Sequence, residues 1–434
     1  MRKLIVILIV LSSVSFAQRI SNGTAWRGGY LPSWDLNVSG IKNGKNDHTA
    51  GRPVKYTSIH YAAFTQIHLF TVGMNSDGTI PVFKYSNGDI CWGDENLTSA
   101  QRKPLNDYIH ESTSCKAMIT IFSNGDGGWF AACTGNSAYR TQLVKTIRDS
   151  LILANKYDGI DFDMEPMNVA DTANYRLFFR ELRDTLERYH QTADPTKHPI
   201  VAVVINNNHV WWSTKMIGLL DQVNVMTYDY MGLWLETMWH NNAVLTAGAT
   251  NPYGGALPSM QLVARFMINA GANPGLIGIG LSTSAYGFKG GKLSTDINQG
   301  CIRPRDRWYG GGFPSANAPT KISWKEMRYR DFKQAYLDTG AAWIKFDAAS
   351  AVPYYSYDGP GWANDQYWTY SDTNTMRAAI VTADTMNLGG IIFWEIGGST
   401  VYTGKDKHPH TTTMLNTIRE LQSDSPMNRS KTVK

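Results

Sequence analysis

The sequence predicts an α/β fold, a (β/α)8 TIM barrel with an α+β insertion between strands 7 and 8. Three observations lead to this prediction. Short apolar runs flanked by turn residues recur along the chain, amphipathic helical patterns lie between several of them, and one interval is too long for a single helix. Strands that alternate with helices favour a parallel sheet.

Eight apolar runs have the length and flanking residues of buried strands. They cover residues 28–34, 65–72, 116–123, 157–165, 199–206, 222–230, 276–282 and 389–395. Eight such units suggest the closed barrel.

Helical patterns lie between several of these runs. Apolar residues recur at helical spacing over residues 139–151 and 175–186, and Asp171 precedes the second pattern as a possible N-cap. The helix of the last unit is expected over residues 371–387.

The insertion is predicted from surplus length. A barrel needs about 250 residues, and more than 100 residues separate the last two runs. This interval contains a Gly/Pro-rich stretch at 289–319 and a strand-like segment at 341–346. We therefore expect an insertion subdomain over residues 286–370, a catalytic barrel over 18–285 and 371–422, and a polar tail over 423–434.

Residues 1–17 have the pattern of a secretory signal peptide. Arg2 and Lys3 precede an apolar run that ends in small residues at Ala17. A membrane anchor is the alternative, but the run is shorter than the roughly 20 residues that span a bilayer. We expect an exported protein, extracellular or periplasmic, that is soluble and leaves the membrane after cleavage.

Charge gives no indication of a nucleic-acid partner. The formal net charge of +5 falls to +3 when Arg2 and Lys3 are removed, and the remaining basic residues are scattered along the chain. Nucleic-acid binding is not expected.

Four cysteines lie outside the leader, and none has a CxxC spacing, so a zinc site is not expected. The four are Cys91, Cys115, Cys133 and Cys301. The sequence is compatible with one disulfide among the first three and also with free buried thiols.

Three carboxylates mark the candidate site. Asp161, Asp163 and Glu165 occupy alternate positions of the fourth run, so they share one face of the predicted strand. In a barrel that face is the lumen, and Glu165 lies nearest the C-terminal mouth, where barrel active sites are found. Crowding of like charges raises the proton affinity of at least one of them, so Glu165 could act as a general acid.

Two other uses of these acids remain open. They could bind a divalent cation, although this stretch lacks the Gly-containing loop typical of such sites. They could also be structural ion-pair partners.

The stretch DGIDFDME, residues 158–165, resembles the D-G-x-D-x-D-x-E motif of glycoside hydrolase family 18, the chitinases and their relatives. FSNG at 122–125 resembles the family's Ser-x-Gly signature. QVNVMTYDY at 222–230 resembles its sixth-strand motif, and GGIIFW at 389–394 its eighth strand. The resemblance covers most of the chain, including the position of the insertion.

This resemblance implies a substrate-assisted mechanism in which the sugar's 2-acetamido group is the nucleophile. Glu165 would be the acid and base, Asp163 would orient the acetamido group, and Asp161 would tune Asp163. Tyr228 would donate to the acetamido oxygen and Asp229 would help to hold the sugar. Met226 would line the site and Trp394 would form its apolar floor. Tyr30 and Trp129 are further candidates for sugar contacts, and the weaker ones are Trp34 and Tyr286.

Two positions depart from the family pattern. SNGDGGW at 123–129 has two extra residues, which affects the placement of Trp129, and Phe288 stands where many members have an arginine. Neither departure falls on the residues assigned to catalysis.

The leading hypothesis is a chitinase that acts on β-1,4-linked N-acetylglucosamine with retention of configuration. The alternatives are an endo-β-N-acetylglucosaminidase that acts on glycoprotein glycans and a chitin-binding lectin of the same fold. A lectin is disfavoured because Glu165 is present. We expect a monomer whose partner is chitin or another glycan with N-acetylglucosamine, and no cofactor or metal.

Overall fold

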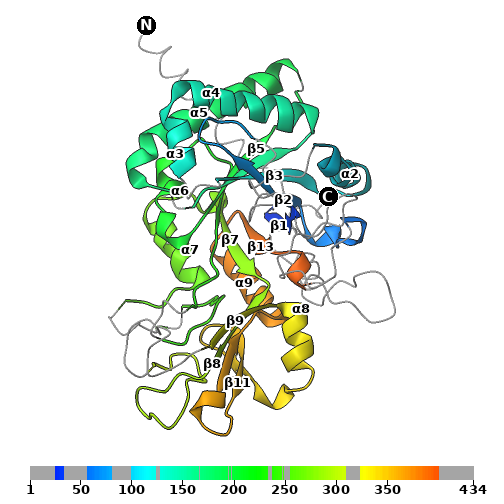
Figure 1. Cartoon of the computed structure of the whole chain (residues 1–434). Coiled ribbons are helices and arrows are strands. Elements are labelled where there is room, and N and C mark those ends of the chain that lie inside the picture. The colour runs from blue at the N-terminus through cyan, green and yellow to red at the C-terminus, as the bar shows by residue number, and fades with distance from the viewer. Residues whose placement is uncertain are drawn as a thin grey trace, which may run out of the picture.

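The computed structural model describes residues 25–33, 56–80, 99–123, 128–165, 167–193, 195–196, 198–232, 237–246, 248, 255–308 and 323–399. Figure 1 shows two parts, a barrel with surrounding helices and a second sheet below it. The predicted leader and the predicted polar tail lie outside the described residues.

Eight parallel strands close the barrel in the order β1-β13-β7-β6-β5-β4-β3-β2. These strands are β1 Trp26–Pro32, β2 Gln66–Met74, β3 Lys116–Ser123, β4 Gly159–Asp163, β5 Ile200–Ile205, β6 Gln222–Val225, β7 Ile277–Ser282 and β13 Gly390–Trp394. Each predicted run forms one of them, and the predicted fold class is confirmed.

Two predicted runs extend beyond their strands. β4 pairs with β5 only as far as Asp163 opposite Val204. β6 ends at Val225, because the N–H of Thr227 donates to the carbonyl of Val225 and turns the chain out of the ladder. The predictions that residue 165 and residues 226–230 lie within strands were therefore wrong.

Helices follow most of the barrel strands. They are α2 Ser99–Ser112, α3 Gly128–Gly135, α4 Ser137–Thr146 with its helical continuation Ile147–Ala154, α5 Thr172–Thr192, α6 Trp212–Lys215, α7 Met260–Asn269 and α9 Thr373–Thr385. The helices predicted near 139–151, 175–186 and 371–387 are present. Asp171 stands directly before α5, but its side chain makes no capping hydrogen bond, because the residue already belongs to the short turn Val169–Asp171 that Asn168 caps.

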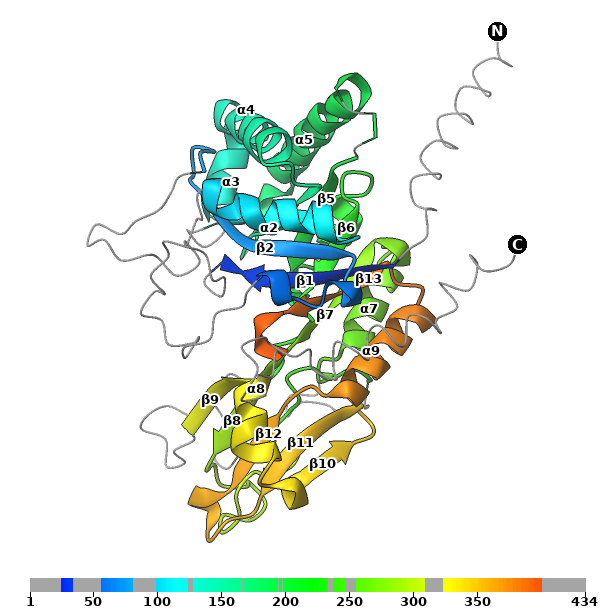
Figure 2. The same cartoon turned by 90° about the vertical axis from the view of Figure 1, so that its right-hand side faces the viewer.

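The second sheet is antiparallel, with strand order β10-β11-β12-β8-β9. Its strands are β8 Ser284–Lys289, β9 Ser323–Arg328, β10 Ile344–Asp347, β11 Val352–Tyr357 and β12 Gln366–Thr369, and α8 Tyr329–Phe332 follows β9. The strand-like segment 341–346 begins as a short turn and becomes a strand only at Ile344. Figure 2 shows α9 running from the side of this sheet back to the barrel. The domain boundaries at 286 and 370 stay predictions.

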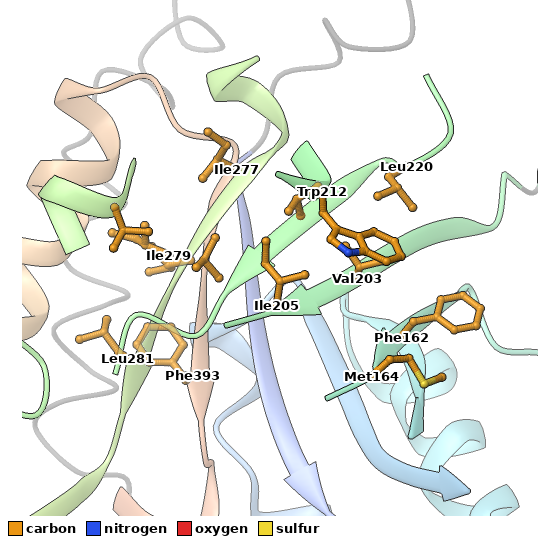
Figure 3. Close-up of a cluster of buried hydrophobic side chains, with 14 of the residues drawn as sticks. Phe162, Met164, Val203, Ile205, Trp212, Leu220, Ile277, Ile279, Leu281 and Phe393 are labelled. Atoms are coloured by element: carbon orange, nitrogen blue, oxygen red, sulfur yellow. The ribbon is translucent and has the colours of Figure 1, made fainter. Parts of the chain in front are cut away.

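The main core lies between the barrel strands and the helices (Figure 3). Phe162 on β4 points outward, and its ring centroid lies 5.4 Å from that of Phe178 and 5.2 Å from that of Phe179, both on α5. Because successive side chains of a strand point to opposite faces, Asp161 and Asp163 must point into the lumen. The aromatic packing of Phe162 therefore determines which way the two acids face.

Cys115, Cys133 and Cys301 are buried free thiols, so the free-thiol alternative holds for these three, and Cys91 lies outside the described residues. Among the helices that the structure describes, none is long and apolar enough to cross a membrane.

Candidate active site

Asp161 is fully buried in the lumen and held by side chains from the adjacent strand β3 and from β1 across the lumen. Its Oδ2 accepts a hydrogen bond of 2.7 Å from the hydroxyl of Tyr30 on β1 and one of 3.1 Å from the hydroxyl of Thr120 on β3. Asp161 thus places an oriented carboxyl group beneath the mouth of the barrel.

Asp163 is the last residue of β4 and lies one step closer to the mouth. Burial raises the pKa of its carboxyl well above the usual range, and the nearby carboxylates Glu165 and Asp161 raise it further. Its Oδ1 has no hydrogen-bond partner among the described residues. An unpaired oxygen on a buried carboxyl group is free to accept an N–H from a bound molecule.

Glu165 stands two residues beyond the end of β4 and is half-buried. Asn206, which directly follows β5, donates from Nδ2 to Glu165 Oε2 over 3.4 Å. Burial raises the pKa of Glu165, which the Asn206 hydrogen bond partly offsets. The rise expected from crowding of like charges is found at Asp163, whereas the pKa of Glu165 is raised by burial.

Tyr228 and Asp229 follow β6 on the turn that leaves the ladder. Tyr228 is buried, and burial raises the pKa of its phenol, which therefore stays protonated and able to donate. Its ring passes close to Gly280 on β7, where a Cβ would lie only 2.8 Å from Tyr228 Cε1. The glycine leaves the space that the tyrosine ring occupies.

Asp229 has a left-handed backbone with φ of 56° and lies at the exposed rim of the mouth. The hydroxyl of Tyr286 on β8 donates to Asp229 Oδ1 over 2.8 Å, which joins the second sheet to the barrel mouth. Protein atoms around the carboxyl desolvate it, and with the nearby charge of Glu326 they raise its pKa to about 6. Glu326 is the β9 residue paired with Tyr286 in the sheet.

An aromatic cluster lies in the lumen beside these acids. Trp394, the last residue of β13, has its ring centroid 6.0 Å from that of Tyr30 and 4.9 Å from that of Phe70. Met226 packs against the same cluster. Since Trp394 and Met226 are only partly buried, they can offer apolar surface to a ligand, whereas Tyr30 is buried and its hydroxyl is used by Asp161.

The structure thus brings Asp161, Asp163, Glu165, Tyr228, Asp229, Met226, Trp394 and Tyr30 to one end of the barrel. Trp129 is half-buried in the first turn of α3, and its contact with a ligand stays a prediction. Trp34 lies outside the described residues. Phe288 is buried and packs against Trp308 with a centroid distance of 6.1 Å, so this side chain belongs to the core of the insertion.

Sequence reasoning missed His68, Thr120, Asn206 and Glu326. The available signal for His68 was a polar residue within an apolar run, at a position that alternation places in the lumen. Asn206 and Glu326 are brought to the mouth by strands distant in sequence, and no local pattern marks them.

This geometry suits acid–base chemistry. A half-buried carboxyl with a raised pKa keeps its proton to a higher pH than an ordinary glutamic acid, and an adjacent carboxylate can stabilise developing positive charge. A protonated phenol beside them supplies a fixed donor.

The sequence profile of the family described as glycosyl hydrolases family 18 matches residues 28–398. Chitinase A1 of Niallia circulans is 23% identical over an alignment of 427 residues, which covers 87% of this chain and 57% of that protein. This chain therefore spans less than two thirds of that relative.

Endochitinase 1 of Metarhizium robertsii is 24% identical over 386 residues, covering 85% of this chain and 81% of that protein. Among solved structures, the group IV chitinase of Ostrinia furnacalis in complex with allosamidin gives a TM-score of 0.70 at 18% identity, over 93% of this chain and 100% of that chain. At this identity the structural likeness concerns the fold.

Proposed function

The chain belongs to glycosyl hydrolase family 18, and on that premise we propose that it is a secreted chitinase that cleaves β-1,4 bonds between N-acetylglucosamine units with retention of configuration. The observation that carries the proposal is that Asp161, Asp163 and Glu165 follow one another from the lumen to the mouth of the barrel. Glu165, the one at the mouth, is half-buried and has a raised pKa. The two relatives compared above are named as chitinases, which supports chitin as the substrate.

In the first step Glu165 gives its proton to the glycosidic oxygen. The bond from that oxygen to the anomeric carbon breaks as the carbonyl oxygen of the sugar's own acetamido group bonds to the same carbon. Asp163 accepts the acetamido N–H and balances the charge of the oxazolinium ring, while the Tyr228 hydroxyl donates to the acetamido oxygen before attack. The apolar face of the sugar packs on Trp394.

In the second step the Glu165 carboxylate takes a proton from water. The resulting hydroxide bonds to the anomeric carbon on the face that the leaving group occupied, and the acetamido group is released. Two inversions at one carbon give net retention.

The test compares wild type with Glu165→Gln on a chitin hexasaccharide, with products followed by mass spectrometry and the first anomer identified by NMR. Glu111→Gln, the same change at an exposed position on α2, is the matched control. We expect short β-anomeric oligomers from wild type and control, and a loss in kcat on the order of 10²- to 10⁴-fold for Glu165→Gln.

Other outcomes lead to the two alternative functions. Tight binding of the hexasaccharide without any turnover would make the protein a lectin. Release of a glycan from a glycoprotein with the hexasaccharide intact would make it an endo-β-N-acetylglucosaminidase. An α-anomer as the first product would exclude the acetamido mechanism.

Export and oligomeric state are part of the same proposal. Cleavage after Ala17 gives a mature protein that begins at Gln18, which N-terminal sequencing of the exported protein checks. Light scattering after size exclusion tests the proposed monomer.

A further inference from the structure

The proposed mechanism gives no role to Asn206, the polar side chain that contacts the acid at the mouth. Strands β4 and β5 pair as far as Asp163 opposite Val204. Continued by one alternate step beyond the paired residues, the same register places Glu165 opposite Asn206. The two side chains meet there, because Asn206 Nδ2 donates to Glu165 Oε2 over 3.4 Å. A side-chain hydrogen bond thus continues the register of the two strands at the mouth.

The turn after β5 determines which atom of the Asn206 amide faces Glu165. Asn206 caps the short turn Asn207–His209, and its Oδ1 accepts a hydrogen bond of 3.0 Å from the backbone N–H of Asn208. A rotated amide would place its own N–H groups against this backbone N–H, and two donors repel each other. Because a backbone N–H can only donate, it fixes the amide oxygen on its own side. Nδ2 is therefore the atom that faces Glu165.

The same turn is anchored both in the core and to the segment that carries Glu165. Trp212, the first residue of α6, is fully buried, and its ring centroid lies 5.3 Å from that of Tyr175 on α5 (Figure 3). His209 is buried, and a hydrogen bond to the backbone of Met167 partly offsets the lowering of its pKa by burial. Met167 lies two residues beyond Glu165. The amide donor therefore sits on a turn whose position is fixed by its neighbours.

A donor at this position acts differently on the two protonation states of Glu165. An N–H group bonds more strongly to a carboxylate than to a protonated carboxyl group. Such bonds are often long in an enzyme without substrate and shorten in the reacting complex. In the proposed mechanism Glu165 becomes a carboxylate when it gives up its proton in the first step, and it uses that charge in the second. The donor therefore favours the state of Glu165 between the two steps.

We propose that Asn206 is a positioning residue which engages Glu165 Oε2 and so keeps Glu165 Oε1 directed first at the glycosidic oxygen and then at water. Asn206 touches no reacting atom and acts through Glu165. The inference rests on the proposed function for its kinetic consequence, whereas the contact itself does not depend on it. In the described part of the chain, the titratable groups whose charges interact with Glu165 are Asp163, Tyr228 and Asp229.

The kinetic test uses Asn206→Ser. Serine can still accept a hydrogen bond from the N–H of Asn208, but its shorter side chain does not extend to Glu165. We expect kcat for chitin oligomers to fall about 5- to 20-fold with KM within about twofold of wild type, because the donor acts mainly on the charged state. The basic limb of kcat/KM against pH should move up by about half a unit, because Glu165 becomes harder to ionise without this donor.

Asn208→Ser is the matched control, since it makes the same change at an exposed position of the same turn and keeps the backbone N–H. It should leave both kcat and the basic limb in place. A folded Asn206→Ser variant with the kcat and the limb of wild type would overturn the proposal. A lower kcat without movement of the limb would also overturn it, because a role confined to the shape of the turn gives that result. Circular dichroism and the unfolding midpoint establish that each variant is folded.

The second measurement uses wild-type protein and needs no activity. With asparagine labelled with ¹⁵N at Nδ2, the side-chain amide signal of Asn206 should shift as Glu165 ionises, and this shift should vanish in Glu165→Gln. The signal is assigned by its loss in Asn206→Ser or, should that variant not fold, in Asn206→Asp. An amide that does not follow pH, or that follows it equally in Glu165→Gln, would refute the contact. If wild type fails to cleave chitin oligomers while the amide follows Glu165, the proposed function fails and the contact stands.

Discussion

Tyr228 illustrates how one side chain at the mouth depends on its surroundings. Its phenol is kept protonated by burial, and its ring occupies space left by a glycine on the adjacent strand. The hydroxyl therefore reaches the site as a donor in a fixed position, which is the arrangement that electrostatic stabilisation of a reacting oxygen requires.

Replacing Tyr228 with Phe removes this donor and keeps the ring. We expect kcat for chitin oligomers to fall about 10- to 100-fold, the value of a lost hydrogen bond to a charged transition state, with a smaller change in KM. Steady-state kinetics check this result. Tyr189→Phe, the same change near the C-terminal end of α5, serves as the control and should stay within about twofold of wild type. A Tyr228→Phe variant of full activity would remove the phenol from the mechanism.

Asp229 gives a prediction about pH. Its pKa is raised to about 6 from an ordinary value near 4, so its carboxyl is protonated below pH 6 and ionised above it. The affinity for oligomers, read from KM across pH 4.5 to 7.5, should change around pH 6 in wild type. The change should be absent in Asp229→Asn. A transition that persists in the variant would have to come from another group.

At the scale of elements, β7 must pass close to the turn after β6. A Cβ on Gly280 would lie 2.7 Å from the carbonyl oxygen of Val225 and 2.8 Å from the ring of Tyr228. Gly280→Ala should therefore displace the tyrosine, lowering kcat about tenfold and destabilising the fold by about 1–3 kcal/mol. Activity assays and urea unfolding measure the two effects.

Gly135→Ala is the control for this change, because a Cβ there meets nothing closer than 3.5 Å. It should leave both activity and stability near those of wild type. Equal effects of the two substitutions would show that the close approach at Gly280 has no special role.

The packing of α5 on β4 determines which way the carboxylates point, so it too can be tested. Phe178 is fully buried against Phe162, whereas its neighbour Leu177 is 46% exposed. Phe178→Ala should lower the free energy of unfolding by about 3–5 kcal/mol, and Leu177→Ala by about 0.5 kcal/mol or less. Chemical denaturation gives both values, and a similar cost for both would contradict the assigned faces of the helix.

At the scale of the whole molecule, polar contacts of Asp347 join the insertion to the barrel. His240, in the segment after β6, lies 2.9 Å from Asp347 on β10, and Arg305 donates to the same carboxylate over 2.8 Å. Burial alone would raise the pKa of Asp347, but the hydrogen bonds from His240 and Arg305 hold it well below the usual range. Burial lowers the pKa of His240 itself, so we assign the effect to these hydrogen bonds.

A depressed carboxyl pKa stabilises the fold above the unfolded-state pKa, near 4, and this stabilisation is lost as pH falls further. Asp347→Asn should therefore lower the unfolding midpoint at pH 7, and its difference from wild type should shrink below pH 4. Thermal unfolding at several pH values provides the measurement. Asp338→Asn, which alters an exposed pair with Lys333, should have little effect at any pH.

Much of this architecture could be predicted from the sequence. The eight strands were visible because barrel strands covered on both faces form nearly continuous apolar runs. The acidic motif was visible because Asp161 and Asp163 interrupt such a run at alternate positions. The ends of β4 and β6 were missed because a strand ends where its neighbours stop pairing, which depends on residues remote in sequence. Asn206, Glu326 and His68 were missed because their importance arises only from what they face across the lumen or the mouth.

The arrangement of the second sheet has a consequence for how the chain folds. Paired strands β7 and β13 are more than 100 residues apart in sequence, as Leu281 opposite Phe393 shows, and closing so long a loop carries an entropic cost that slows folding. However, β8 and β12, near the two ends of the insertion, are themselves neighbours, with Tyr286 opposite Thr369. If the insertion folds first, the pairing of β8 with β12 therefore brings the end of β7 close to the segment that leads to β13. In kinetic terms it acts as a short connection, and the last barrel strand can pair without waiting for a long loop to close.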